Sequence, residues 1–246
     1  MTYCAAIRLE KGMIFASDTR TNAGVDHIST FRKLYQYGVE GERFMVLQTA
    51  GSLATSQAVF NKLQNDINQR SESNLNTVAT LFDGAQMVGE CMRSVMTHAQ
   101  MIANDNNSGT FTSSFLLGGQ IKGQAPELYM IYPEGNCIRA TRDTPFFQLG
   151  ESKYGKPILD RSVEYNTDVN HAAQALMLSF DSTIHSNLSV GMPIDFMIYQ
   201  NDSLTLPKGR RIKADDEYFL DISRQWADAL RRTLVELPAC PDDYWD

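Results

Sequence analysis

The hydrophobic pattern of this chain changes its period along the sequence, and the order of these changes limits the fold more than any other feature. Alternating patterns typical of strands come first, two amphipathic helical patterns follow, and strand patterns then return around two further helices. The predicted strands cover 2–9, 12–18, 32–39, 42–49, 111–117, 127–132, 136–140, 146–149 and 194–200. The predicted helices carry apolar stripes over 53–67, 81–102, 169–184 and 219–233.

Strands that are segregated from helix pairs pack as separate layers, so we expect an α+β fold. The expected architecture is a four-layer αββα sandwich, with two antiparallel sheets between helix layers. We expect a single domain over 1–246, in which 104–109 is a loop and 238–246 is a possible C-terminal tail. Because this tail places Tyr244 and Trp245 among acids, it is either an ordered contact with a neighbour or a frayed end.

Composition excludes several classes of protein. Of the 246 residues, 43% are hydrophobic and 21% are charged, which is typical of a soluble globular protein. No apolar run approaches the roughly 20 residues that a membrane span needs. The N-terminus lacks a basic region followed by an apolar core, so no secretory signal is predicted. We therefore expect a cytoplasmic protein with no membrane partner.

Charge and residue spacing argue against nucleic acid, metal and cofactor. The net charge is −7, whereas a broad nucleic-acid footprint needs a basic face, and the basic run 208–213 is predicted to be a solvated connection. The four cysteines include no CxxC pair, and the four histidines lack metal-ligand spacing. Glycine pairs such as the one at 118–119 lack the dinucleotide fingerprint. The sequence thus predicts neither a metal site nor a nucleotide cofactor.

Thr2 stands at the start of the first predicted strand, so removal of Met1 would leave a threonine as the first residue of a folded domain. A terminal threonine carries a hydroxyl nucleophile and a free α-amine together. The α-amine has a reference pKa of roughly 7.7 to 8.0, close to what a general base at neutral pH requires. Thr2 is therefore the predicted nucleophile.

Three further features accompany Thr2. Asp18 ends the second predicted strand, Lys33 begins the third, and Gly51 stands at a strand-to-helix junction. Together this pattern resembles the catalytic β-subunits of proteasomes and the bacterial HslV protease, and within that superfamily it is most similar to the Anbu family. The likeness covers nearly the whole chain in element order, while its specific motifs lie in the first fifty residues and around 150–155. It implies an N-terminal nucleophile hydrolase fold, a threonine peptidase and a homo-oligomer of many subunits.

The residue types suit this chemistry. The Thr2 hydroxyl would attack a carbonyl to form an acyl-enzyme, which water would then release. Lys33, as a cation, would favour the neutral form of the nearby α-amine, or, if neutral, it could take the hydroxyl proton itself, and the sequence leaves both roles open. Asp18 is expected to hold Lys33 and tune its charge. The backbone NH of Gly51 is the predicted oxyanion donor.

The resemblance also implies where a substrate would bind. A peptide or unfolded protein would lie extended between Thr21 and Asn22 on one side and Gly51 and Ser52 on the other, as an added strand. Thr49 and Leu53 would border a side-chain pocket that is neither charged nor large. The partner that would unfold such a substrate is unknown from the sequence.

The chain departs from the family near the expected position of the α-amine. The family carries a serine in a Gly-Ser-Gly-Ser-like loop and an Asp-x-x-Ser pair at a later helix end. Ser152 and Ser189 match the two serine positions, whereas the aspartate is absent. Glu151 could contact the terminal amine or face solvent, and a carboxylate there would raise the proton affinity of the amine and slow catalysis by it.

Two other functions are compatible with these residues. One is an N-terminal nucleophile amidase or acylase, with the same catalytic atoms but a closed pocket for a small amide. The other is a catalytically silent assembly subunit, against which the presence of Thr2, Asp18 and Lys33 argues.

Overall fold

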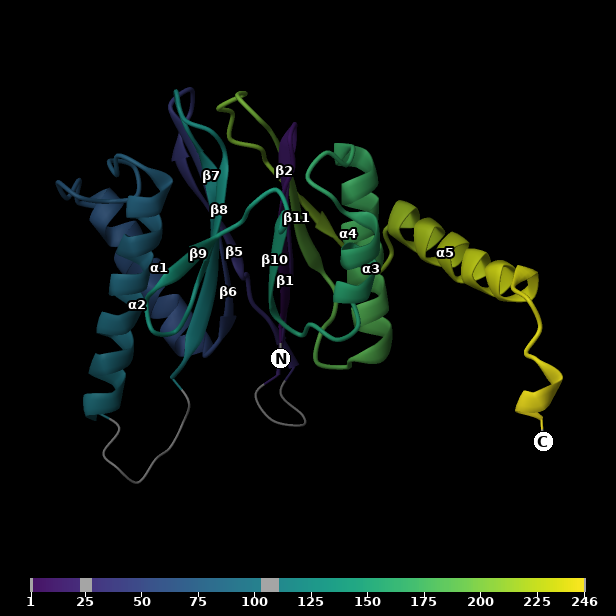
Figure 1. The fold of residues 1–246 in the computed structure, drawn as a ribbon. Helices are drawn as coiled ribbons and strands as arrows, with labels where there is room; N and C mark the ends of the chain where they lie inside the picture. Colours follow the sequence, from purple (N-terminus) through teal and green to yellow (C-terminus); the bar gives the residue numbers. More distant parts are fainter. Residues whose placement is uncertain (1, 23–27, 103–110, 246) are drawn as a thin grey trace.

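Two antiparallel sheets lie face to face at the centre of the molecule (Figure 1). The structure is a computed structural model and describes residues 2–22, 28–102 and 111–245. The first sheet has the order β10-β1-β2-β11-β12 and the second β5-β6-β7-β8-β9. The first comprises β10 Phe146–Gly150, β1 Tyr3–Arg8, β2 Gly12–Asp18, β11 Ile194–Gln200 and β12 Arg210–Ile212. The second comprises β5 Leu34–Val39, β6 Arg43–Gly51, β7 Ser113–Ile121, β8 Glu127–Ile131 and β9 Cys137–Arg139.

Helices cover both outer faces of the sheet pair (Figure 1). The second sheet is covered by α1 (Leu53–Asn68) and α2 (Leu81–Ile102). The first sheet is covered by α3 (Lys156–Ser162) and α4 (Val169–Ser186). The predicted four-layer αββα architecture is therefore confirmed.

The burial of β2 shows how the layers pack against each other. Every residue from Gly12 to Asp18 is buried, because one face of the strand packs against α4 and the other against the second sheet. Between the sheets, Phe15 meets Phe44, and the Phe44 ring stacks on Tyr199 with centroids 4.2 Å apart. Burial of such apolar faces on both sides is the main stabilising contribution of the layered design.

A buried amide links the two sheets within this apolar layer. Gln48 of β6 is fully buried, and its side-chain nitrogen donates to the carbonyl oxygen of Ala16 at 2.7 Å and to the Ser17 hydroxyl at 3.0 Å. A polar group buried in an apolar layer stabilises only the arrangement that satisfies it. Gln48 therefore favours one alignment of β6 against β2.

Several short elements differ from the sequence-based expectation. β3 (Arg20–Asn22) pairs with β4 (Ile28–Thr30), and α3 follows Gly155, although neither the hairpin nor this helix was predicted. Part of the basic run forms β12, which pairs with β11, so the expectation of a connection was wrong there, although Arg210 and Arg211 are exposed as expected. These elements are too short for their periodicity to be recognised. The predicted loop 104–109 lies outside the described residues.

Helix α5 (Glu217–Glu236) projects away from the layered body (Figure 1). The Asp216 side chain caps it by accepting from the backbone nitrogen of Phe219 at 3.0 Å. Phe219 is its buried residue, and a short 3-10 turn, η1 (Asp242–Tyr244), follows. Within the described ranges, no helix combines the length and apolarity needed to cross a bilayer.

Candidate active site

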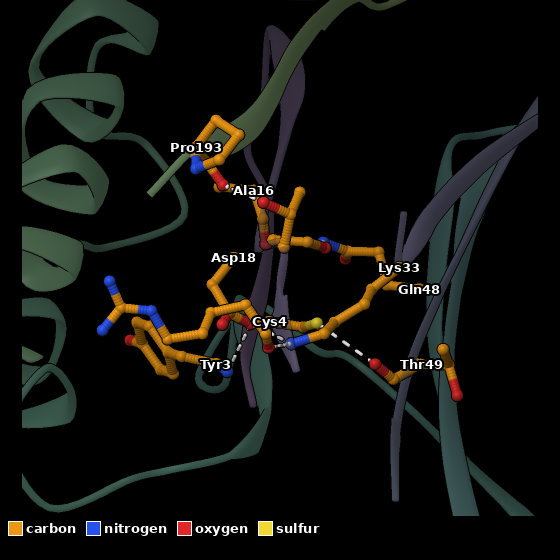
Figure 2. Close-up of polar contacts among 11 residues, drawn as sticks. Tyr3, Cys4, Ala16, Asp18, Lys33, Gln48, Thr49 and Pro193 are labelled. Atoms are coloured by element: carbon orange, nitrogen blue, oxygen red, sulfur yellow. Dashed lines mark hydrogen bonds and ion pairs between the residues drawn. The ribbon is translucent and has the colours of Figure 1, made fainter. Parts of the chain in front are cut away.

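The strand ends that carry the predicted catalytic residues meet at one end of the sheet pair. Antiparallel pairing aligns Cys4 of β1 with Ser17 of β2, so Asp18 lies beside the start of β1. In the second sheet, β5 begins where β6 ends, because Leu34 pairs with Gln48. The two sheets approach each other here, since the Cys4 thiol donates to the Thr49 carbonyl oxygen at 3.3 Å (Figure 2). Residues far apart in the sequence are thereby brought together.

Lys33 and Asp18 form a buried ion pair at this end (Figure 2). The Lys33 ammonium Nζ donates to Asp18 Oδ1 at 2.7 Å and to the carbonyl oxygen of Arg20 at 2.6 Å. The backbone nitrogen of Tyr3 donates to the same carboxylate oxygen at 3.1 Å. Lys33 is 4% exposed and Asp18 is fully buried. The pair thus anchors the residue that follows Thr2.

Opposing effects set the charge of Asp18. Burial raises the pKa of its carboxyl group, while the neighbouring Lys33 ammonium opposes that rise. A protonated lysine has three N–H donors, and the acceptors on Asp18 and Arg20 take two of them. One donor therefore remains for a group in the adjoining cleft.

Thr2 and Lys33 line the same cleft, whose volume is about 290 Å³. Its lining residues are Thr2, Thr21, Lys33, Thr49, Ala50, Gly51, Leu53, Ser56 and Gly150. Six of these were predicted from the sequence, and among the described lining residues only Lys33 carries a formal charge. The side of the cleft formed by Thr49 and Leu53 is accordingly uncharged.

Gly51 occupies a backbone conformation that favours glycine. Its φ is +120°, and an added Cβ would meet the Thr112 carbonyl oxygen and lie 2.8 Å from Ser113 Cα. Gly51 ends β6, and Ser52 then caps α1 by accepting from the backbone nitrogen of Thr55 at 3.3 Å. The turn therefore places the main chain of Gly51 in the cleft wall directly before a helix N-terminus.

Ser56 is a residue of the cleft that the sequence did not identify. Its hydroxyl lies 2.8 Å from the Thr49 hydroxyl and 3.2 Å from that of Ser113. The available signal was its place on the apolar stripe of the predicted helix, where a serine is unusual. Ala50 and Gly150 complete the lining and were also not among the predicted site residues.

Other predicted residues lie outside this lining. Ser52 caps α1, Ser152 is exposed, and Ser189 is half-buried with its backbone nitrogen bonded to the Asn187 side chain at 2.9 Å. The backbone of Asn22 belongs to β3, whereas its side chain and Met1 lie outside what the structure describes.

Glu151 joins the start of the chain to the end of α4. Its backbone nitrogen donates to the Thr2 carbonyl oxygen at 2.7 Å. Its Oε1 accepts from the backbone nitrogens of Lys153 at 2.8 Å and Ser152 at 2.9 Å, and its Oε2 accepts from the Asn187 amide at 2.7 Å. These bonds, the one from Lys153 above all, lower the pKa of Glu151. The carboxylate therefore supports the loop that holds Thr2, and of the two alternatives left open by the sequence, the one in which it faces solvent does not hold.

Comparison with known proteins places this geometry in a family. A family model described as proteasome subunit matches residues 2–198. Among solved structures, the helical assembly of the Anbu complex from Pseudomonas aeruginosa is 52% identical, with a TM-score of 0.93, over 98% of this chain and 99% of that one. Anbu (ancestral beta-subunit) from Yersinia bercovieri is 48% identical, with a TM-score of 0.91, over 97% and 98% of the two chains.

This chain belongs to the Anbu family of proteasome subunits. A Gly-1 mutant of Anbu from Hyphomicrobium sp. strain MC1, 45% identical with a TM-score of 0.91 over 98% of this chain and 100% of that one, agrees. Comparison with curated proteins gave no significant match. The resemblance inferred from Thr2, Asp18, Lys33 and Gly51 is thus confirmed, and the chain is a proteasome-like subunit of the Anbu type.

Proposed function

We propose that this Anbu-family chain is an N-terminal threonine peptidase whose nucleophile is Thr2. The observation that carries the proposal is that one cleft contains Thr2 together with Lys33, whose ammonium is held by the buried Asp18. A nucleophile, a nitrogen base and a group that orients the base are the parts that such catalysis requires.

The reaction begins after removal of Met1, which frees the α-amine of Thr2. The Thr2 hydroxyl oxygen forms a bond to the substrate carbonyl carbon, and its proton passes to a nitrogen base and then to the leaving amine as the peptide bond breaks. Water next attacks the resulting ester and regenerates the hydroxyl. The base is either the α-amine, kept neutral by the Lys33 charge, or Lys33 itself.

The cleft wall suits the remaining steps. The backbone NH of Gly51 is proposed to donate to the developing oxyanion, for which the positive-φ turn before α1 positions the main chain. An extended peptide is proposed to pair with the backbone of Thr21 and Asn22 on one side and of Gly51 and Ser52 on the other. The uncharged surroundings of Thr49 and Leu53 favour small or apolar side chains in the adjoining pocket. Ser152 and Ser189 stay predicted polar neighbours of the amine.

We also propose that the chain forms a homo-oligomer. α5 projects from the body with exposed apolar residues, among them Leu234 at 70% and Val235 at 86%. Exposed apolar surface of this kind is typical of a contact with another molecule. The related protein from Pseudomonas aeruginosa is described as a helical assembly, which supports assembly of the present chain.

Two measurements test the peptidase proposal. Intact mass of protein made in its native host should show Met1 removed, and quantitative retention of Met1 would contradict the mechanism. A threonine-directed electrophilic probe should label the wild type, while Thr2→Ala should abolish labelling. Thr21→Ala is the matched control, because it removes a hydroxyl from the same cleft and should still be labelled to completion. Labelling that persists in Thr2→Ala would place the nucleophile elsewhere.

A further inference from the structure

A second cleft, called the basic cleft below, lies between the edge strands of the two sheets and shares no lining residue with the candidate active site. Strand β5 is an edge of the second sheet and β12 is an edge of the first. The cleft has a volume of about 280 Å³, and four of its lining residues are basic: Arg32, Lys208, Arg210 and Arg211. Arg32 precedes β5, whereas the other three lie in β12 or just before it. Stacking of the two sheets therefore gathers these cations at one site.

Ion pairs neutralise two of these cations and hold them in position. Arg211 donates two hydrogen bonds to Asp195, at 2.7 and 2.9 Å, and Arg210 donates one to Asp216 at 2.6 Å. A guanidinium group has five N–H donors, so both arginines keep donors that these carboxylates do not use. The two pairs thus form an ordered frame that can still donate to a ligand.

The other two cations have no counter-charge. Arg32 and Lys208 are exposed and belong to no ion pair among the described residues. The four cations and the two paired carboxylates therefore leave a net charge of +2 at the basic cleft. A local positive charge on a chain whose net charge is −7 favours an anionic ligand at this place.

The rest of the lining combines main chain with apolar side chains. Leu34, Phe196 and Met197 line the cleft and are themselves buried. Gly209 also lines it, and because glycine has no side chain, the main chain itself borders the cleft there. Arginine, lysine and main-chain N–H groups are the donors that hold phosphate oxygens in proteins. The lining therefore suits a phosphate group and offers apolar surface to an organic substituent.

We propose that the basic cleft binds a phosphate group, with Arg32 and Lys208 as its main partners. A phosphate monoester carries a charge of about −1.5 to −2 at pH 7, which matches the net charge of the cleft, whereas a carboxylate carries a single charge. Arginine binds phosphate oxygens through two parallel N–H donors, and lysine adds a compact positive charge. A volume of about 280 Å³ lies close to the lower limit for small-molecule sites, which suits a small ligand. This inference is independent of the proposed peptidase and of the proposed homo-oligomer.

Titration calorimetry on the full chain at low ionic strength tests this site, with phenyl phosphate and inorganic phosphate as probes. The cleft variant, Arg32→Gln with Lys208→Gln, removes both unpaired charges. The control, Lys11→Gln with Lys122→Gln, removes the same charge at two exposed lysines that do not line the cleft. The cleft variant should bind phenyl phosphate about tenfold more weakly or worse, because it loses charge-assisted hydrogen bonds, while the control matches the wild type. Circular dichroism establishes that each variant is folded.

The probes also distinguish the source of the phosphate group. Tighter binding of phenyl phosphate than of inorganic phosphate would identify a phosphorylated organic molecule, whose substituent contacts the apolar lining. Binding of inorganic phosphate that is at least as tight would identify free phosphate.

Two further ligands can overturn the inference. Benzoate has the same ring as phenyl phosphate but a single negative charge, so it should bind more weakly. Equal affinity for benzoate, or tighter binding of a tetra-aspartate peptide, would show that the cleft does not select phosphate. The inference would also fail if the wild type bound neither phosphate probe, if the cleft variant bound phenyl phosphate as well as the wild type, or if the control were as weak as the cleft variant.

Discussion

The buried pair of Asp18 and Lys33 allows a quantitative test of the electrostatic coupling between two charged side chains at the candidate active site. Replacement of Asp18 by asparagine keeps the shape of the side chain and an acceptor for the Tyr3 backbone nitrogen, but leaves the buried Lys33 without its counter-charge. Loss of one partner of a buried ion pair costs about 3 to 5 kcal/mol. We expect Asp18→Asn to lower the free energy of unfolding by about 3 kcal/mol.

Removal of the lysine should destabilise the fold less than removal of the aspartate. Lys33→Met leaves a carboxyl group whose pKa burial already raises, so Asp18 can take up a proton and become neutral. We expect a loss of about 2 kcal/mol near neutral pH, which shrinks as the pH falls because the protonated carboxyl needs no counter-charge. The double variant removes both charges and should lose about 2 kcal/mol, against about 5 for the sum of the single changes. The expected coupling is therefore about 3 kcal/mol.

Urea unfolding of the four proteins at one fixed protein concentration measures this coupling, since assembly makes apparent stability depend on concentration. The m-values should stay equal, so that the shifts report stability and not a change in compactness. Additive single losses, with a coupling near zero, would refute the view that the pair acts as one buried electrostatic unit.

Three further outcomes are expected. Gly51→Ala forces a side chain into a positive-φ turn beside Thr112 and should lower peptide turnover about 100-fold. The control Gly41→Ala, at φ +77° with open space around it, should leave turnover unchanged. Equal turnover of the two variants would contradict the proposed oxyanion turn. The pKa of Glu151 is lowered in the fold, so its carboxylate stabilises the folded protein at pH values above its usual pKa of 4.5, and this stabilisation is lost as the pH falls. The difference in unfolding free energy between wild type and Glu151→Gln should therefore vanish in acid. A difference that is independent of pH would argue against the loop contacts. Iodoacetamide at about pH 8 should label the exposed Cys240 and spare Cys4, whose pKa burial raises to about 12, until denaturant is added, and early labelling of Cys4 in peptide mapping would contradict its buried position.

The long elements could be predicted because their patterns are local. The seven residues of β2 and the apolar stripe of α2 have the periods of a strand and a helix, so both were predicted with the bounds that the structure shows. The seven-residue α3 and the three-residue β12 have no such period. They form because neighbouring segments pair or pack with them, and that information is not present in a short window. The division into one domain with a tail stays a prediction.

In the candidate site, too, some residues could be predicted from the sequence and others could not. Thr2, Lys33 and Gly51 could be placed together because their order along the chain resembles that of proteasome β-subunits, and the structure brings them into one cleft. The role of Glu151 could not be read in this way. One of its partners is Asn187, which is 36 residues away and reaches the loop only after α4 has packed on the first sheet.

The sequence alone determined which of the long segments become strands and helices and which side chains can attack, donate or accept protons, because these depend on the chemistry of each residue and on the pattern of its near neighbours. Tertiary structure decided which of these groups meet. Stacking of the two sheets brought Thr2 and the Lys33 of the Asp18–Lys33 pair to one cleft, and packing of α4 on the first sheet brought Asn187 to Glu151. Both results depend on contacts between residues far apart in the chain, which form only when the layers pack.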